Sequence, residues 1–270
     1  MAPRTHIAVI GGGISGLSTA WYLAKAAPPT VTVTLLEATK RTGGWLHSDR
    51  VKDPIQDHHG GSLLLEYGPR SLRPQGASGL NTLELVKDLK LESRLEPILK
   101  TSPAAMNRFI YSRNKLHMLP NTLAGALSHP LILPKLPRAS LDLIRGGSGR
   151  EDESIQEFVT RRFGKAFSDD LISAMVHGIY AGDASKLSLR STFGILYQLE
   201  KDFGSVILGM LMGGSGSAET AWDRILKEKI LHDAPDLKDF IDKTSIYSFK
   251  DGIEELAKAM EHALIQTLVP

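Results

Sequence analysis

The stretch His6-Ile-Ala-Val-Ile10-Gly11-Gly12-Gly13-Ile14-Ser15-Gly16 decides the fold of this chain. A short apolar run leads into a Gly-x-Gly-x-x-Gly turn, and a helical pattern follows to Lys25. Pro28-Pro29 ends that pattern, and a second apolar run from Val31 closes with the acid Glu37. Strand, glycine turn, helix and acid-terminated strand form one βαβ unit, which is the context that gives the glycine motif its meaning. The pattern predicts a Rossmann-type dinucleotide site.

Each position of the motif has a physical task. Gly11 permits the tight turn, Gly13 lets backbone N–H groups approach a diphosphate, and Gly16 lets the helix pack closely on the sheet. The N-terminus of the helix directs partial positive charge at that diphosphate. The Glu37 carboxylate can accept hydrogen bonds from ribose hydroxyls, which favours a free 2′-hydroxyl. The predicted contacts are Gly11, Gly12, Gly13, Ile14, Ser15, Gly16, Glu37 and Ala38.

A second glycine motif distinguishes FAD from NAD. Arg41-Thr42-Gly43-Gly44 resembles the Arg-x-Gly-Gly signature that follows the ribose acid in flavin amine-oxidase-like enzymes. Adjacent glycines let the backbone lie against a bulky ligand, and Arg41 supplies positive charge near phosphates. An ordinary Gly-Gly turn with a surface arginine is the alternative. We therefore expect FAD, with Arg41, Gly44 and Trp45 among its contacts.

Composition excludes several classes of protein and site. The 270 residues suffice for one large or two ordinary domains, and the net charge of +2 does not indicate nucleic acid binding. The absence of cysteine excludes disulfides, thiolate nucleophiles and iron–sulfur clusters. We expect no signal peptide, and no apolar run reaches the roughly 18 residues of a spanning helix. His58 and His59 are adjacent, which suits a solvated loop better than a metal site. We expect no metal and no catalytic side chain.

Four further segments carry a more specific resemblance. They are Glu66-Tyr67-Gly68-Pro69-Arg70-Ser71-Leu72-Arg73-Pro74, Asn107-Arg108-Phe109, Gly178-Ile-Tyr-Ala-Gly182 and Ser205-Val-Ile-Leu-Gly209. With the two glycine motifs, and in this order, they resemble the protoporphyrinogen oxidase family of the eukaryotic haem pathway. The resemblance covers only the amino-terminal part of that family.

The resemblance implies roles for particular residues. Gly68-Pro69-Arg70-Ser71 matches the segment that passes close to the flavin, where positive charge favours the anionic reduced form. Arg108 matches the arginine that pairs with a substrate propionate, a contact that suits a guanidinium. Gly178 belongs to a segment that could line a flat ligand. From the residues alone, a solvent-facing turn arginine, a strand-edge arginine and a plain helix–helix loop stay open at these three places.

The expected fold is α/β, a Rossmann-type FAD-binding domain with a mainly helical inserted domain and the carboxy-terminal part of the family fold missing. We place the first part of the FAD-binding domain at 1–118, the helical domain at 119–215 and returning helices at 216–270. The proline-broken segment 120–143 either docks on a membrane, as the resemblance implies, or packs only on protein. Within these domains we expect a helix over 80–95 with Asn81 as N-cap, a hairpin over 101–119, a helix capped by Ser154, and a buried apolar segment over 203–214.

The resemblance also implies an activity. It is oxidation of protoporphyrinogen IX to protoporphyrin IX by FAD, with molecular oxygen as acceptor, peripherally at the mitochondrial inner membrane. A homodimer is compatible with the sequence, and we expect the shortened FAD sheet to impair cofactor binding and turnover. Two alternatives stay open, another flavin amine oxidase or desaturase, and a non-catalytic fragment.

Overall fold

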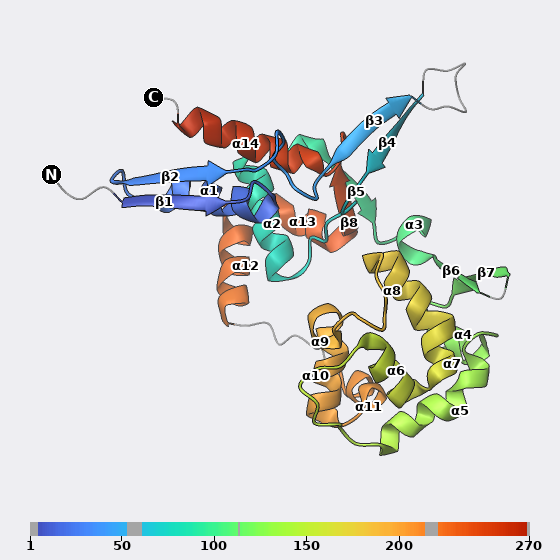
Figure 1. Ribbon diagram of the computed structural model, residues 1–270. Helices are drawn as coiled ribbons and strands as arrows, with labels where there is room; N and C mark the ends of the chain where they lie inside the picture. Colours follow the sequence, from blue (N-terminus) through green and yellow to red (C-terminus); the bar gives the residue numbers. More distant parts are fainter. Residues whose placement is uncertain (1–4, 53–60, 113, 214–220, 269–270) are drawn as a thin grey trace. The chain divides into compact units, whose positions relative to one another are not determined.

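The computed structural model describes residues 5–52, 61–112, 114–213 and 221–268. Contacts between residues divide the chain into two compact units, which we call unit 1 (Met1–Ser102 with Ala221–Pro270) and unit 2 (Pro103–Thr220) (Figure 1). The sequence placed the divisions elsewhere, at 118/119 and 215/216. The first division falls earlier because the hairpin over 108–119 packs on helices of unit 2 through the buried Ile110.

Unit 1 begins with the predicted βαβ element. Its parts are β1 (Thr5–Ile10), α1 (Ile14–Ala26) and β2 (Val31–Leu36). The strands pair in parallel, with Ile10 opposite Leu36. Parallel neighbours need a crossover connection, and α1 supplies it while burying Leu17 and Ala20 in the core. The α/β prediction is confirmed.

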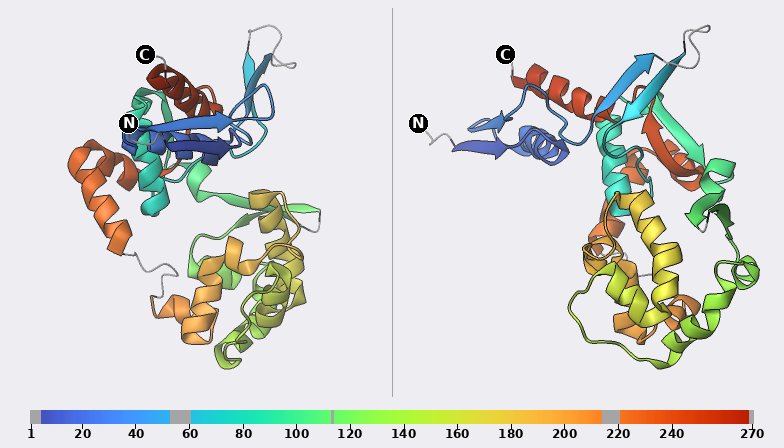
Figure 2. Two further views of the ribbon diagram at one scale, coloured as in Figure 1. Left: turned by 60° about the vertical axis from the view of Figure 1, so that its left-hand side comes forward. Right: turned by 45° about the vertical axis from the view of Figure 1, so that its right-hand side comes forward.

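Four further helices complete the core of unit 1. They are α2 (Gly76–Asp88), α12 (Ala221–Asp233), α13 (Asp236–Lys243) and α14 (Glu254–Leu268). α14 packs against α1, and Figure 2 shows this pair from two further sides. The wholly buried side chains include Leu83, Tyr247, Ile253 and Met260. The core thus combines residues from both ends of the chain, and the segment that follows unit 2 covers the nucleotide element.

Unit 1 also contains two antiparallel strand pairs that were not predicted from the sequence, one a hairpin and the other formed by strands far apart in the chain. β3 (Ser48–Lys52) pairs with β4 (Ser62–Glu66), and β5 (Leu95–Leu99) pairs with β8 (Thr244–Phe249). A short turn, η1 (Glu92–Arg94), precedes β5. The expected helix over 80–95 is wrong at both ends, because α2 begins at Gly76 with Gln75 as N-cap, and Leu95 already belongs to β5. Asn81 lies inside the helix.

Unit 2 contains one hairpin and many short helices. In chain order its elements are α3 (Pro103–Met106), β6 (Arg108–Ser112), β7 (Lys115–Leu119), α4 (Leu123–Ser128), η2 (Leu133–Lys135), α5 (Leu136–Ala139), η3 (Ser140–Ile144), α6 (Ile155–Phe163), α7 (Lys165–Phe167), the π-helical turn η4 (Ser168–Ile172), α8 (Ser173–Tyr180), α9 (Leu189–Thr192), α10 (Gly194–Phe203) and α11 (Val206–Leu211). The hairpin and the mainly helical character agree with the sequence. Pro130, Pro134 and Pro137 keep the helices of segment 120–143 short.

A buried charge network joins the helices of unit 2. The wholly buried Arg162 of α6 donates to Asp142 Oδ1 (2.9 Å) and also binds Glu200. Arg161 donates to the same Glu200 carboxylate (2.9 Å), and Ser205 donates to Asp142 Oδ2 (2.6 Å). η3, α6, α10 and the start of α11 are thereby linked. α6 itself begins at a capping box of Ser154 and Glu157, which confirms the predicted cap.

The segment 203–214 corrects a second expectation. α11 buries Val206 and Gly209, but Met210, Leu211 and Met212 are 56, 71 and 66% exposed. α11 packs on one face only, so the expectation of burial is wrong for Met210, Leu211 and Met212. Among the helices of the described ranges, none combines the length and apolarity needed to cross a membrane.

Candidate cofactor site

The N-terminus of α1 begins directly after β1 and the glycine turn. Gly13 is the N-cap, with φ −70° and ψ 178°, and no side chain caps the helix. The first N–H groups of a helix have no partner within it, and the helix dipole gives them partial positive charge. This end of α1 therefore offers donors to an anionic group. Ser15 and Ala38 are exposed, and Ile14 is half-buried.

Glycine occupies the positions of this turn for different structural reasons. Gly11 has a φ of +99°, which residues with a side chain rarely adopt. A Cβ at Gly16 would lie 1.8 Å from the Gly11 carbonyl oxygen, so the close packing there requires glycine. A Cβ at Gly13 would meet only the Gly44 Cα, at 3.9 Å. The space over Gly13, beside the N–H donors of α1, fits the diphosphate of a dinucleotide.

Glu37 follows β2 and reaches back to the glycine turn. Its Oε2 accepts a hydrogen bond from the Gly12 N–H (2.7 Å), and its Oε1 accepts from the N–H and the hydroxyl of Thr39 (both 2.8 Å). The hydrogen bonds from Thr39 and then Gly12 lower the pKa of Glu37 below its usual value, so the carboxylate is charged at neutral pH. Each carboxylate oxygen has lone pairs left to accept from ribose hydroxyls.

The Gly43–Gly44 turn packs on the first glycine turn, backbone against backbone. The Gly43 N–H donates to the Gly12 carbonyl (2.8 Å), and a Cβ at Gly44 would lie 3.0 Å from the Gly13 Cα. Both glycines of the second motif have positive φ, 97° and 58°. The two motifs, separate in sequence, therefore form one backbone surface that only glycine permits.

Arg41 holds this second turn. Its Nη1 donates to the carbonyls of Thr42 (2.8 Å) and Leu46 (3.1 Å), and its Nη2 donates to that of Gly44 (2.7 Å). Nη1 also lies 3.4 Å from Glu254 Oε1. The sequence predicted this guanidinium near phosphates, whereas the structure shows it bound to backbone carbonyls and close to a carboxylate.

The segment Gly68-Pro69-Arg70-Ser71 follows β4 and touches the second turn. A Cβ at Gly68 would lie 1.9 Å from the Trp45 carbonyl oxygen, so the two backbones are in contact. The Trp45 indole is 80% exposed, and Pro69, Arg70 and Ser71 are also exposed. Unit 1 thus brings together the three segments that the sequence assigned to FAD. The contact of each residue with FAD stays a prediction.

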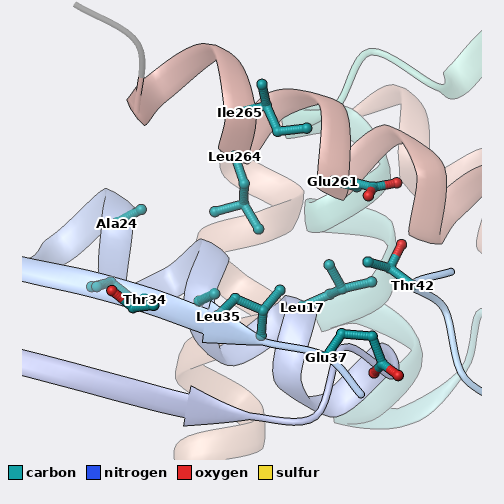
Figure 3. Close-up of a pocket in the computed structure, with 11 residues that line it drawn as sticks. Leu17, Ala24, Thr34, Leu35, Glu37, Thr42, Glu261, Leu264 and Ile265 are labelled. Carbon is teal, nitrogen blue, oxygen red and sulfur yellow. The ribbon is translucent and has the colours of Figure 1, made fainter. Parts of the chain in front are cut away.

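A cavity of about 370 Å³ lies beside Glu37, between β2, α1 and α14 (Figure 3). Apolar side chains such as Leu17, Leu35 and Leu264 form most of its wall, and Thr42 lies at its polar end with Glu37. Among the described residues that line it there is no lysine or arginine. The cavity is therefore an apolar neighbour of the glycine surface and does not suit a diphosphate.

The two predicted substrate residues lie in unit 2. Arg108 is the first residue of β6, is exposed, and pairs with Leu119 of β7. Gly178 was expected in the loop between two helices, and this is wrong because α8 continues to Tyr180. The loop starts at Ala181, with φ +48°, and a Cβ at Gly178 would meet nothing within 4 Å. The propionate and ligand-lining roles stay predictions.

Three residues brace this site in a way that was not predicted from the sequence. Ser48 of β3 donates its hydroxyl to Glu66 of β4 (2.5 Å), and its N–H to Glu254 of α14 (3.1 Å). Ser48 and Glu66 lie opposite each other in the β3–β4 hairpin, whereas Glu254 comes from a distant part of the chain. Glu66 belongs to one of the motifs quoted from the sequence, but no local pattern indicated these contacts. Within the described ranges no three metal-binding side chains come together, and His58 and His59 lie outside those ranges.

Comparison with known proteins agrees with this geometry. The model of the flavin containing amine oxidoreductase family matches residues 14–267. A protein of Schizosaccharomyces pombe named protoporphyrinogen oxidase is 38% identical over 96% of this chain and 54% of its own length. A Bacillus subtilis protein named coproporphyrinogen III oxidase is 36% identical over 81% of this chain and 46% of its own. The chain thus spans about half the length of these relatives.

A solved structure supports the fold. It is described as a protoporphyrinogen oxidase from Exiguobacterium, and it matches 96% of this chain and 51% of its own, with a TM-score of 0.63 at 23% identity. The family match begins at Ile14, inside the first glycine motif, and covers the second glycine motif, all of unit 2 and nearly all of α14. This chain belongs to the flavin containing amine oxidoreductase family.

Proposed function

We propose that this chain binds FAD and serves the oxidation of protoporphyrinogen IX to protoporphyrin IX, with molecular oxygen as acceptor. The observation that carries the proposal is the joint glycine surface, with an open space over Gly13 and a charged Glu37 at its edge. The name of the S. pombe relative supports the substrate class. The chain spans about half of that relative. The proposal therefore concerns the binding of FAD and the orientation of the substrate, which residues of this chain would perform.

The proposed chemistry needs binding and orientation more than a protein nucleophile. FAD bound at this site would supply a hydride acceptor for a methylene bridge of the substrate and a route for the electrons to oxygen, giving hydrogen peroxide. The α1 N-terminus holds the diphosphate, Glu37 holds the ribose, and Arg70 places positive charge near the flavin. Arg108 orients the tetrapyrrole through a propionate. The substrate loses six hydrogen atoms, as three pairs of one hydride and one proton. Three molecules of oxygen take up these pairs and become three molecules of hydrogen peroxide, so the reaction balances.

The direct test supplies the 270-residue chain with FAD and the reduced, colourless tetrapyrrole under air. We expect porphyrin fluorescence to develop with three molecules of hydrogen peroxide formed for each porphyrin, and both should disappear when FAD is omitted. A panel with an amine, a carotenoid and coproporphyrinogen III separates the alternatives. Oxidation of the amine or the carotenoid alone would contradict the proposal, and flavin binding without any turnover would favour the non-catalytic fragment.

We expect flavin to bind this polypeptide weakly when it is expressed alone. β1 and β2 pair only with each other among the described strands, and Ile10 and Leu36 are 86% and 51% exposed at their ends. An incomplete sheet with exposed apolar side chains is a poor platform for a ligand. FAD should therefore separate from the chain on gel filtration yet still be measurable by equilibrium dialysis. Stoichiometric flavin after gel filtration would show this expectation to be wrong.

Replacing Glu37 with glutamine should weaken FAD binding about 10- to 100-fold, because hydrogen bonds to a charged group are worth roughly 1.5–3 kcal/mol. The loss should appear in equilibrium dialysis with FAD. FMN lacks the adenosine ribose, so its affinity should be the same for both proteins. Glu92→Gln, an exposed acid on η1, is the matched control. Equal losses for FAD and FMN would place Glu37 away from the ribose.

Replacing Arg108 with alanine should raise the KM for the tetrapyrrole about 10-fold or more, because a charge-assisted pair with a propionate is lost. FAD affinity should not change. Arg108→Lys should recover only part of the effect, since lysine lacks the fork geometry. Lys115→Ala removes a cation from the neighbouring strand and is the control. An unchanged KM would mean that Arg108 is a strand-edge arginine that does not bind the substrate.

Location and assembly follow the same proposal. Peripheral contact with the mitochondrial inner membrane, through the proline-broken segment 120–143, and a homodimer are further proposals. Sedimentation with cardiolipin-containing vesicles and analytical ultracentrifugation test them separately. Absence of vesicle binding would favour a helical domain that packs only on protein.

A further inference from the structure

A buried carboxylate lies behind the cofactor surface, outside every motif that the sequence revealed. Glu254 is the first residue of α14 and is 4% exposed. Its Oε2 accepts from the Ser48 N–H (3.1 Å) and lies 3.2 Å from Lys258 Nζ, and its Oε1 lies 3.4 Å from Arg41 Nη1. Burial acts to raise the pKa of Glu254, but the Ser48 N–H and Lys258 outweigh it and lower the pKa. The group is therefore charged at neutral pH.

Glu254 is itself fixed from two sides. The Ser48 hydroxyl accepts from the Glu254 N–H (3.1 Å), and Glu66 accepts from the N–H of Ile253 (2.9 Å). A Cβ at Gly252 would lie 2.4 Å from the Ser48 hydroxyl, so the approach of these segments requires glycine there. The first turn of α14 is therefore anchored on the β3–β4 hairpin, and its carboxylate has one fixed position.

The partner of Glu254 on the cofactor side is Arg41. Two of the Arg41 nitrogens hold the carbonyls of Thr42, Gly44 and Leu46, so one guanidinium defines the whole turn. A turn with two adjacent glycines at positive φ loses much conformational entropy when it is fixed. It needs such a brace to keep one shape before a ligand arrives.

The braced turn in turn shapes the diphosphate space. Gly43 donates to Gly12, and Gly44 packs over Gly13, which is the N-cap of α1. A chain of contacts therefore runs from α14 through Glu254 and Arg41 to the N–H donors of α1. Arg41 and Glu254 are 213 residues apart in the sequence, so this contact depends on the tertiary fold.

We propose that Glu254 is a positioning residue of the cofactor site: its carboxylate fixes Arg41, and Arg41 fixes the Gly43–Gly44 turn against the N-terminus of α1. This inference deepens the proposed function and rests on it for the identity of the ligand. Glu254 does not touch the ligand in this account. It acts by preordering the turn, so that less entropy is lost on binding.

The test compares Glu254→Gln with Glu255→Gln in the 270-residue chain. Glutamine keeps the size of Glu254 and an acceptor for Ser48, but it loses the charge that holds Arg41. Glu255 neighbours Glu254 in the same helical turn and pairs with Arg94 instead (2.8 Å), so its variant loses an arginine contact of α14 without touching the cofactor turn. A general loosening of α14 should affect both variants alike.

Two measurements decide the outcome. Hydrogen exchange at the Gly43 amide reports on the turn without any ligand, and it should speed up about 10-fold in Glu254→Gln but not in Glu255→Gln. Equilibrium dialysis should show FAD affinity reduced about 10-fold in Glu254→Gln only, with no further loss in the double variant with Arg41→Gln beyond that of Arg41→Gln alone. Additive losses would mean that Glu254 does not act through Arg41.

The two proposals fail in different ways. Unchanged Gly43 exchange in Glu254→Gln, or faster exchange with unchanged FAD affinity, would overturn the positioning role while leaving the proposed function intact. If the unaltered chain binds no FAD at any concentration, the proposed function fails, and the positioning role for a flavin fails with it. In that case the exchange result still shows whether Glu254 orders the turn.

Discussion

Replacing Arg162 with alanine should lower the free energy of unfolding of unit 2 by about 3–5 kcal/mol, because breaking a buried ion pair leaves an uncompensated charge. Arg162 and Asp142 are both wholly buried, and the Asp142 carboxylate has Arg162 as its ion-pair partner in the described structure. Asp142 would keep the hydrogen bonds from Ser205 and Ile207 but would have no positive charge beside it.

A second signal, specific to unit 1, shows whether the loss is confined to unit 2. The three tryptophans, Trp21, Trp45 and Trp222, all belong to unit 1. Urea unfolding followed by far-ultraviolet circular dichroism should therefore show the loss, while the tryptophan fluorescence transition should keep its midpoint. Arg161→Ala is the matched control. Its side chain is 25% exposed and Glu200 keeps Arg162, so we expect a loss of only about 1 kcal/mol.

A rescue experiment sharpens this result. Asp142→Asn combined with Arg162→Met removes both charges, and replacing a buried pair by uncharged groups costs far less than breaking it. The double variant should recover a large part of the lost stability. Equal losses in Arg162→Ala and Arg161→Ala, or a double variant worse than the single one, would contradict the assignment of this network as a buried ion pair.

Replacing Gly16 with alanine should abolish FAD binding and destabilise unit 1 by about 3 kcal/mol or more, at the upper end of overpacking effects. The new Cβ would lie 1.8 Å from the Gly11 carbonyl oxygen, which is backbone and cannot move without opening the turn between β1 and α1. Equilibrium dialysis with FAD and urea unfolding followed by tryptophan fluorescence measure the two effects.

Gly13→Ala is the control that separates fold from ligand. Its Cβ would meet only Gly44, at 3.9 Å, and the φ of −70° suits alanine, so stability should be almost unchanged. The methyl group would occupy the space proposed for the diphosphate, and FAD affinity should fall at least about 10-fold, or 1.4 kcal/mol. Gly13→Ala with unchanged FAD affinity would refute the placement of the diphosphate at this cap.

Much of the nucleotide element could be read from local sequence. Gly11, Gly13 and Gly16 have spacing that a strand-to-helix turn imposes over a few residues, and Glu37 closes a strand of the same unit. The structure shows that strand–turn–helix–strand order with the expected bounds. The Ser154 cap was also readable, because a capping box depends on two residues three positions apart.

Three predictions were wrong because they relied on local patterns of residues, which do not reveal tertiary contacts. The leucines of 80–95 have helical spacing throughout, yet Leu95 pairs with Phe249 in an antiparallel strand pair whose partners lie far apart in the chain, so no local pattern reveals it. The methionines near residue 211 looked like core, but a six-residue helix buries only one face. Gly178 looked like loop because glycine disfavours helix, and α8 tolerates it in its last turn.

The sequence by itself determined the βαβ element, the two glycine motifs and the family resemblance, because each depends on residues close together in the chain. Only the tertiary structure decided that the two motifs share one surface, that Arg41 binds backbone carbonyls, and that Glu254 braces it from α14. It also decided which charges of unit 2 are buried together. Such contacts join segments far apart in the chain, and their partners are chosen by packing, which has no period along the sequence.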